Sequence, residues 1–189
     1  MRFAILLMAL SHCVGLTLFP PSGGAPTSLQ QRANSETTTR CDVKAYVIDH
    51  DPKGLNVRSG PGPMNKVIGN LPNQDVEGIR VHVTGAQGDW VRIDLAVEEG
   101  GEQERTFFKG EGWLYGPLLG VDGVGWIEGG TKLYEAPRQR SRILGRMLGG
   151  GEGGTVRGCR GEWMYVEHKK VKGWAAPGTL CSNPLTTCS

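Results

Sequence analysis

The sequence predicts an all-β protein built from two small units in tandem, and three observations carry this prediction. The 189 residues include 30 glycines and 11 prolines, a composition that suits short strands and tight turns rather than long helices. Apolar and polar residues alternate with a period of two in residues 43–49, 81–83 and 90–93, as in half-buried strands. Finally, the sequence repeats itself, which is typical of duplicated units.

Three blocks of the first unit recur in the second in the same order. The matching segments are 55–71 with 131–147, 85–93 with 158–166, and the Gly-Trp pairs that begin at residues 112 and 173. The spacing between blocks differs, mainly because the first copy holds an insertion near residues 96–107. We therefore place the first unit at residues 41–120 and the second at 121–189. The spacing of turn residues is typical of a small barrel or sandwich.

The first unit resembles the bacterial SH3 (SH3b) family. The phrase GLNVRSGPG at residues 54–62 is similar to the family's most recognisable motif, and VIGNLP, GDWVRI and GWL follow it in the family's order. In the second unit KLYEAP replaces that motif, so the resemblance there depends on ILGRM, GEWMYV and GWA. The resemblance covers everything after residue 40. It implies two tandem SH3-like β-barrels, of which the second is degenerate.

The N-terminus has the pattern of a secretory signal peptide over residues 1–25. Arg2 supplies the positive start, residues 3–10 form an unbroken apolar run, and a helix-breaking stretch ends in Ala25. This order of charge, apolar core and small-residue exit is typical of export signals. The sequence therefore predicts a secreted or periplasmic protein.

Two alternatives to cleavage stay open. A membrane anchor is one, although His12 and the early prolines leave few apolar residues to span a bilayer. Lipidation at Cys13 is the other, although bulky His12 precedes the cysteine where a lipobox has a small residue. The next segment, residues 26–40, is polar and is predicted to be a flexible linker.

Removing the signal peptide leaves four cysteines, which favours two disulfides in an oxidising compartment. They are Cys41, Cys159, Cys181 and Cys188. A metal site fits poorly, because the chain has no CxxC pair and no histidine at ligand spacing from a cysteine. Four cysteines allow three connectivities, and sequence alone does not choose among them. We favour Cys159 with Cys181, which leaves Cys41 with Cys188.

No catalytic constellation is recognisable, so the sequence predicts a protein that is not an enzyme and holds no cofactor or metal. The SH3b family often accompanies cell-wall hydrolases of the NlpC/P60 or amidase kind, which need a Cys-His set or a metal-binding His/Glu set. None of the histidines lies near a plausible nucleophile in sequence, and we interpret them as surface or edge residues. They are His12, His50, His82 and His168.

Two further motifs are interpreted as loops. Residues 149–154, GGGEGG, match GxGxxG, but the next residues suggest a strand and a turn, whereas a phosphate-binding loop precedes a helix. Asp49 and Asp51 lie in the segment DHDPKG, which lacks the remaining ligands of a calcium loop. We expect a turn there.

The strand at residues 90–93 offers an aromatic ring beside a cation. Its valine and isoleucine share one face, and its tryptophan and arginine share the other. Exposed aromatic rings are common binding anchors. The predicted ligand-binding residues are Trp90, Arg92, Arg58, Trp163 and Tyr165. Trp113 and Trp174, which follow glycine on the closing strands, are expected in the core.

Charge is divided unevenly between the units. Residues 41–120 hold eight Lys/Arg against twelve Asp/Glu, a balance of −4, and residues 131–189 hold ten against four, a balance of +6. A solvated surface, docking of the two units, and attraction to an anionic envelope polymer all remain open. The net charge of +2 does not call for a nucleic-acid partner, and we expect no membrane span after signal removal.

The resemblance implies a non-catalytic binding module that recognises cell-wall (peptidoglycan) peptides or an envelope protein. The alternative is a structural or adaptor protein of the envelope that mediates protein–protein interaction. The ligand itself and the oligomeric state do not follow from the sequence, because SH3-like barrels serve many partners.

Overall fold

The residues that the structure describes form thirteen strands and one 3-10 turn, and none of them is in an α-helix. The structure is a computed structural model that describes residues 37–73, 78–100, 105–149, 153–183, 185, 186 and 188. These residues belong to one compact unit, Glu36–Ser189. The predicted signal peptide, Cys13 and residues 26–36 of the predicted linker lie outside the described residues. In the described part no helix has the length and apolar character needed to cross a membrane.

The strands are short, as the glycine and proline content predicts. They are β1 (Thr39–Val47), β2 (Leu55–Arg58), β3 (Val67–Leu71), β4 (Ile79–Gln87), β5 (Trp90–Glu98), β6 (Thr106–Tyr115), β7 (Leu119–Gly123), β8 (Thr131–Tyr134), β9 (Ile143–Met147), β10 (Gly154–Arg160), β11 (Trp163–His168), β12 (Val171–Ala175) and β13 (Leu180–Cys181). The 3-10 turn η1 (Gly116–Leu118) joins β6 to β7. Strand β1 includes the last two residues of the predicted linker, because Thr39 and Arg40 pair with Ala86 and Gly85 of β4.

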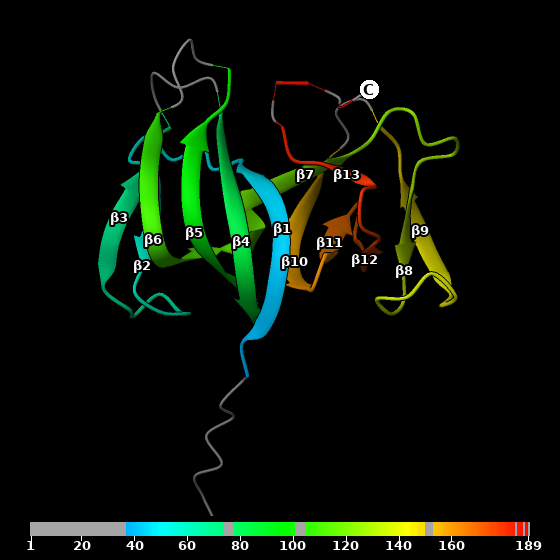
Figure 1. Ribbon diagram of the computed structural model, residues 1–189, viewed down its shortest axis with the longest axis horizontal. Helices are drawn as coiled ribbons and strands as arrows, with labels where there is room; N and C mark the ends of the chain where they lie inside the picture. Colours follow the sequence, from blue (N-terminus) through cyan, green and yellow to red (C-terminus); the bar gives the residue numbers. More distant parts are fainter. Residues whose placement is uncertain are drawn as a thin grey trace, which may run out of the picture. The chain divides into compact units, whose positions relative to one another are not determined.

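The strands form a single open path with the order β3-β2-β6-β5-β4-β1-β7-β10-β11-β12-β8-β9, and β13 pairs with β7 (Figure 1). Every ladder between named strands is antiparallel. The all-β prediction is therefore confirmed. Two closed barrels are not seen, because among the described residues β3 pairs with β2 alone and β9 with β8 alone, which leaves the sheet open at both ends.

The ladders within β1–β7 recur within β7–β13. Pairs β1·β4, β1·β7, β2·β3, β2·β6, β4·β5 and β5·β6 have as counterparts β7·β10, β7·β13, β8·β9, β8·β12, β10·β11 and β11·β12. Strand β7 belongs to both sets, since it is the last strand of the first and the first strand of the second. The predicted boundary between residues 120 and 121 falls inside this shared strand.

Alternation along the strands places the core where the sequence predicts it. Val91 and Ile93 are fully buried, while Trp90 and Arg92 on the other face of β5 are half-buried. The buried apolar side chains form one continuous cluster that includes residues of both halves. Its largest fully buried members are Leu71, Ile79, Ile93, Leu114, Leu119, Leu133, Val57, Val81, Val83, Val91 and Val121.

The two tryptophans expected in the core differ in burial. Trp113 is 5% exposed and meets the expectation. Trp174 is only half-buried, so that expectation is wrong. The reason is the pleat of β12: Gly173 and Ala175 turn toward the core, and Trp174 projects from the other face beside its ladder partner Tyr165 of β11.

The four cysteines form two disulfides, as predicted, but the pairing that we favoured is wrong. The disulfides join Cys41 to Cys159 and Cys181 to Cys188. Strand β1 passes beside the β10–β11 turn, where Gly161 accepts a hydrogen bond from the Asp42 amide at 2.9 Å and its own amide donates to Arg40. This contact brings Cys41 and Cys159 together. The first disulfide therefore links the two halves of the chain.

The structure describes only the two ends of the predicted glycine-rich loop at residues 149–154. The glycine-rich segment ends at Gly154, where β10 begins, and a turn at residues 161 and 162 follows before β11; residues 150–152 lie outside the described residues. The insertion in the first copy lengthens a hairpin, since β5 and β6 are longer than their counterparts β11 and β12.

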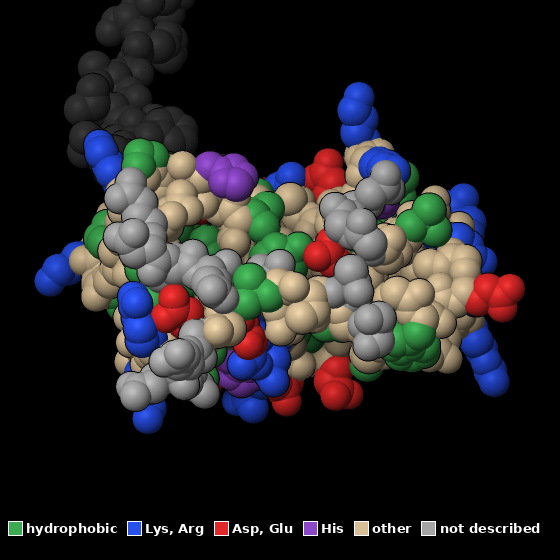
Figure 2. Space-filling model, turned by 90° about the horizontal axis from the view of Figure 1, so that it is seen from above, with side chains coloured by type: hydrophobic (Ala, Val, Ile, Leu, Met, Phe, Trp, Pro, Cys, Tyr) green, Lys and Arg blue, Asp and Glu red, His purple; other side chains and the backbone are tan. Residues whose placement is uncertain are grey.

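On one face of the molecule, charged side chains of opposite sign lie among each other (Figure 2). On the face drawn in Figure 2, Lys and Arg side chains project around the margin, with Asp and Glu side chains among them. One ion pair links the two halves: an Nη atom of Arg157 lies 3.6 Å from a carboxylate oxygen of Asp89. This pair accords with a solvated surface that includes limited docking of the halves by charge.

Candidate ligand-binding groove

A cavity of about 460 Å³ opens in the first half of the chain, and we call it the first groove. It lies where the β1–β2 loop, the ends of β2 and β6, the start of β5 and η1 come together. Its lining residues are Asp49, Asp51, Gly54, Leu55, Asn56, Arg58, Pro63, Trp90, Tyr115 and Leu118. A cavity of this size is ordinary for a small-ligand or peptide site.

Two aromatic rings give the groove its apolar surface. Trp90 of β5 and Tyr115 of β6 are direct partners in the β5·β6 ladder. Their ring centroids lie 5.4 Å apart with the planes tilted by 51°, a favourable arrangement for an aromatic pair. Tyr115 is 38% exposed and Trp90 is half-buried. Both rings can therefore contact a ligand without rearrangement of the sheet.

Charged side chains at the same groove are held by local hydrogen bonds. The carboxylate of Asp49 accepts a hydrogen bond from the Asp51 amide at 3.0 Å, and that of Asp51 accepts one from the Lys53 amide at 2.9 Å. These contacts confirm the predicted turn. The guanidinium of Arg58 donates to the carbonyl oxygen of Asn65 at 2.8 Å. The groove thus presents two anions and one cation beside its aromatic rings.

The corresponding positions of the second half are filled differently. The matching ladder registers place Tyr134 where the first half has Arg58, and Ala176 where it has Tyr115. Tyr134 is 8% exposed and packs edge-on against Trp163, with 5.8 Å between ring centroids and a 77° interplanar angle. The Tyr134 ring therefore fills the space beside Trp163 that corresponds to the first groove beside Trp90.

The structure brings together only two of the five predicted ligand-binding residues, Arg58 and Trp90. Arg92 lies outside the groove lining, where its guanidinium contacts the Thr84 side chain and carbonyl at 3.3 and 3.4 Å and Glu111 at 3.5 Å. Trp163 packs on Tyr134, and Tyr165 lines a separate cavity.

Sequence reasoning missed the other lining residues, and among them Tyr115, Asp49 and Asp51 carry the aromatic and acidic groups of the groove. Tyr115 could not be identified, because its place opposite Trp90 depends on the register of the β5·β6 ladder, which the sequence does not specify. For Asp49 and Asp51 the sequence analysis considers calcium binding alone and predicts a turn. Their position in a turn just before the motif at residues 54–62 could have indicated that they line the groove.

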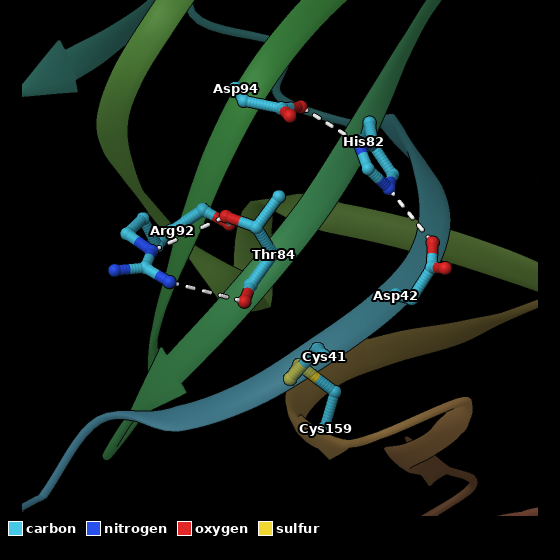
Figure 3. Close-up of polar contacts among 7 residues, drawn as sticks. All are labelled: Cys41, Asp42, His82, Thr84, Arg92, Asp94 and Cys159. Atoms are coloured by element: carbon cyan, nitrogen blue, oxygen red, sulfur yellow. Dashed lines mark hydrogen bonds and ion pairs between the residues drawn. A yellow bond between two sulfur atoms is a disulfide. The ribbon is translucent and has the colours of Figure 1, made fainter.

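His82 is the centre of a second polar cluster that the sequence did not reveal (Figure 3). Its Nδ1 atom lies 2.7 Å from a carboxylate oxygen of Asp94, and its Nε2 atom lies 3.0 Å from one of Asp42. Burial by itself lowers the pKa of His82, but the two carboxylates outweigh burial, so the pKa is raised above its ordinary value. Asp42 follows Cys41 of the inter-half disulfide.

A raised pKa of His82 makes folding stability depend on pH. The folded state binds the imidazole proton more tightly than the unfolded chain does, so this stabilisation is fully present below the ordinary value of 6.5 and is lost as the pH rises through the folded-state pKa. We expect the wild type to lose more stability than His82→Gln between about pH 5.5 and about pH 8.5. Urea unfolding at both pH values measures this. His50→Gln is the control, and a wild-type pH slope equal to that of His82→Gln contradicts the prediction.

Another histidine departs from the sequence interpretation. His168 was interpreted as a surface or edge residue, yet it is 6% exposed. Its Nδ1 atom lies 3.1 Å from the carbonyl oxygen of Gly153, which satisfies it inside the fold.

In the part of the chain that the structure describes, no group of three or more His, Cys, Asp and Glu side chains could hold a metal ion. The predictions of no enzyme activity and no cofactor stay predictions.

Comparison with known proteins gives one family match. The model of the bacterial SH3 domain matches residues 53–120, and no match was found among curated proteins. Two solved structures, NlpC2 and NlpC1 from Trichomonas vaginalis, are 12% and 10% identical over 78% and 74% of this chain, with TM-scores of 0.29 and 0.28. The chain covers 49% and 45% of those chains, about half their length. Residues 53–120, which supply most of the first groove, thus match the bacterial SH3 domain.

Proposed function

We propose that the protein is a non-catalytic module of the cell envelope whose first groove binds a short peptide segment of the cell wall. The observation that carries this proposal is the combination of an aromatic pair, two carboxylates and one guanidinium in one cavity of about 460 Å³. The rings of Trp90 and Tyr115 accept an apolar or backbone surface, Asp49 and Asp51 accept an amine, and Arg58 pairs with a carboxylate. Wall peptides carry both kinds of charge.

An envelope location is part of the proposal. Two disulfides support it, because such bonds persist in oxidising compartments. The apolar pattern of residues 3–10 also supports it as an export signal.

We further infer that the second half is a degenerate copy of the same domain. The recurrence of the six ladders in β7–β13 supports this, together with the sequence repeat. The burial of Tyr134 against Trp163 supports loss of peptide binding by this copy, since the ring fills the position equivalent to the first groove.

A pull-down with insoluble peptidoglycan at low and high salt tests the proposal. We expect the wild type to bind at both salt concentrations and Trp90→Ala to lose at least tenfold in affinity, about 1.4 kcal/mol or more, because an aromatic anchor in a groove contributes on that scale. Trp163→Ala is the matched control, since it removes the equivalent ring of the second half, and it should bind as the wild type does.

Three other results would reject peptide binding in the first groove. Binding that disappears at high salt in every variant indicates charge attraction alone. Equal loss in both tryptophan variants places the site elsewhere. Complete absence of binding, together with co-purification of a protein partner, supports the adaptor alternative.

A further inference from the structure

A second cavity, of about 370 Å³, lies where the two halves of the chain meet, and we call it the second groove. The first half contributes the start of β1 and the β4–β5 turn, and the second half contributes β10, β11 and β12. Its lining residues are Thr37, Thr39, Ala86, Gln87, Gly88, Arg157, Gly158, Cys159, Arg160, Tyr165 and Trp174. No carboxylate is among them, which distinguishes this cavity from the first groove.

Two aromatic rings and a guanidinium form one side of the second groove. Tyr165 and Trp174 are ladder partners whose ring centroids lie 5.0 Å apart, with an interplanar angle of 37°. Both side chains are half-buried, so part of each ring faces the cavity. The guanidinium carbon of Arg160 lies 5.8 Å from the Trp174 ring centroid. The three side chains together form an amphipathic surface with a cation at its edge.

The two arginines of this groove differ in their electrostatic state. Arg157 is neutralised by Glu167 at 2.7 Å and Asp89 at 3.6 Å. Arg160 is exposed, and in the described part of the chain no carboxylate lies within 4.0 Å of its guanidinium. Arg160 is therefore the cation that remains available to an anionic ligand.

The walls of the second groove are fixed relative to each other by covalent and polar links. Cys159, which is 3% exposed, lines the groove and is bonded to Cys41 of β1. The backbones of Asp42 and Arg40 exchange hydrogen bonds with Gly161 at 2.9 and 2.8 Å. A cavity held in this way loses little conformational freedom on binding, which favours affinity.

We propose that the second groove binds a sugar residue that carries a carboxylate. A pyranose ring stacks on the faces of Tyr165 and Trp174, and its carboxylate pairs with Arg160. The lining also includes the neutral side chains of Thr37, Thr39 and Gln87; the Gln87 side-chain oxygen accepts a hydrogen bond from Thr38 at 3.1 Å, and the neutral polar groups of this lining suit sugar hydroxyl and amide substituents. The proposal rests on the proposed function, since it adds a glycan contact to the peptide contact of the first groove.

An acidic peptide fits this cavity less well. A peptide offers no pyranose face of C–H groups to the aromatic pair, and the lining has no carboxylate to receive a peptide amine. The cavity volume also suits a compact ligand rather than an extended strand.

The test titrates the full-length protein with N-acetylmuramic acid and, separately, with N-acetylglucosamine, which has the same ring but lacks the lactyl carboxylate. The indole N–H signals of Trp174 and Trp90 in ¹H–¹⁵N spectra report the two grooves. We expect both sugars to shift the Trp174 signal but not that of Trp90, and the acidic sugar to bind about fivefold more tightly because of its charge-assisted hydrogen bond.

Arg160→Gln should abolish this fivefold preference, because the glutamine amide carries no charge to pair with the sugar carboxylate. Arg140→Gln is the matched control: it removes the same charge from another exposed position of the second half and should keep the preference. Because both arginines are exposed, neither variant is expected to impair folding.

Several outcomes overturn the proposal. They are an unmoved Trp174 signal in the wild type with both sugars, equal loss of preference in both arginine variants, and an equal Trp174 shift with acetate or an acidic peptide at the same concentration. Failure of the proposed function gives a different result: peptidoglycan pull-down is insensitive to Trp90→Ala while the Trp174 sugar shifts persist.

Discussion

Replacing both Cys41 and Cys159 with serine is expected to lower the free energy of unfolding by about 5 kcal/mol. The disulfide that they form spans a sequence separation of 118 residues. Closing so long a loop removes much of the conformational entropy of the unfolded chain, and this loss increases with loop length. Urea unfolding under non-reducing conditions measures the change.

The second disulfide provides the matched control. Cys181 and Cys188 are separated by 7 residues, so their double serine variant should lose only about 2.5 kcal/mol by the same reasoning. Equal losses in the two variants would show that loop length does not determine the effect. The first variant should also weaken sugar binding in the second groove, since Cys159 lines that cavity.

Gly54→Ala is expected to destabilise the protein by about 3 kcal/mol and to disturb the first groove. Gly54 has a φ of +76°, which an alanine adopts only at a cost. A Cβ atom there would lie 2.3 Å from the carbonyl oxygen of Leu71, a backbone atom of β3 that cannot move without breaking the β2·β3 ladder. The cost of the backbone conformation and the cost of the steric contact add.

Gly178→Ala is the control variant that carries the cost of the backbone conformation without the steric contact. Gly178 has nearly the same φ, +72°, but a Cβ atom there meets nothing within 4 Å. We expect this variant to lose only about 1 kcal/mol, the cost of the backbone conformation alone. Thermal or urea unfolding of both variants measures the difference. If the two alanine variants are equally stable, the contact with Leu71 does not constrain the groove.

Local pattern was enough to predict the strands and the faces of β5. Val91 and Ile93 are buried and Trp90 and Arg92 face outward because side-chain direction alternates along any strand. The turn at Asp49 and Asp51 was predictable for a similar reason, since aspartate side chains bond to nearby amides. These features depend on neighbours in sequence.

Features that depend on distant pairing were not predictable. Cys41 bonds to Cys159 because β1 passes beside the β10–β11 turn. The spacing of the cysteines along the sequence therefore could not predict the disulfide pairing. Tyr115 joins Trp90, and Asp42 and Asp94 meet at His82, only through ladder registers. The second groove likewise could not be predicted, because its lining comes from both halves of the chain and no single repeat contains it.

The sulfur–sulfur bond between β1 and β10 also determines how the chain carries mechanical tension. A pull between a point before Cys41 and a point after Cys159 passes directly through the covalent link and leaves residues 42–158 without load. In the oxidised protein the whole SH3-matched segment, 53–120, is therefore shielded from extension in this direction. Under a pull of this kind the first groove would stay intact, while only the chain before Cys41 and the chain after Cys159 would lengthen.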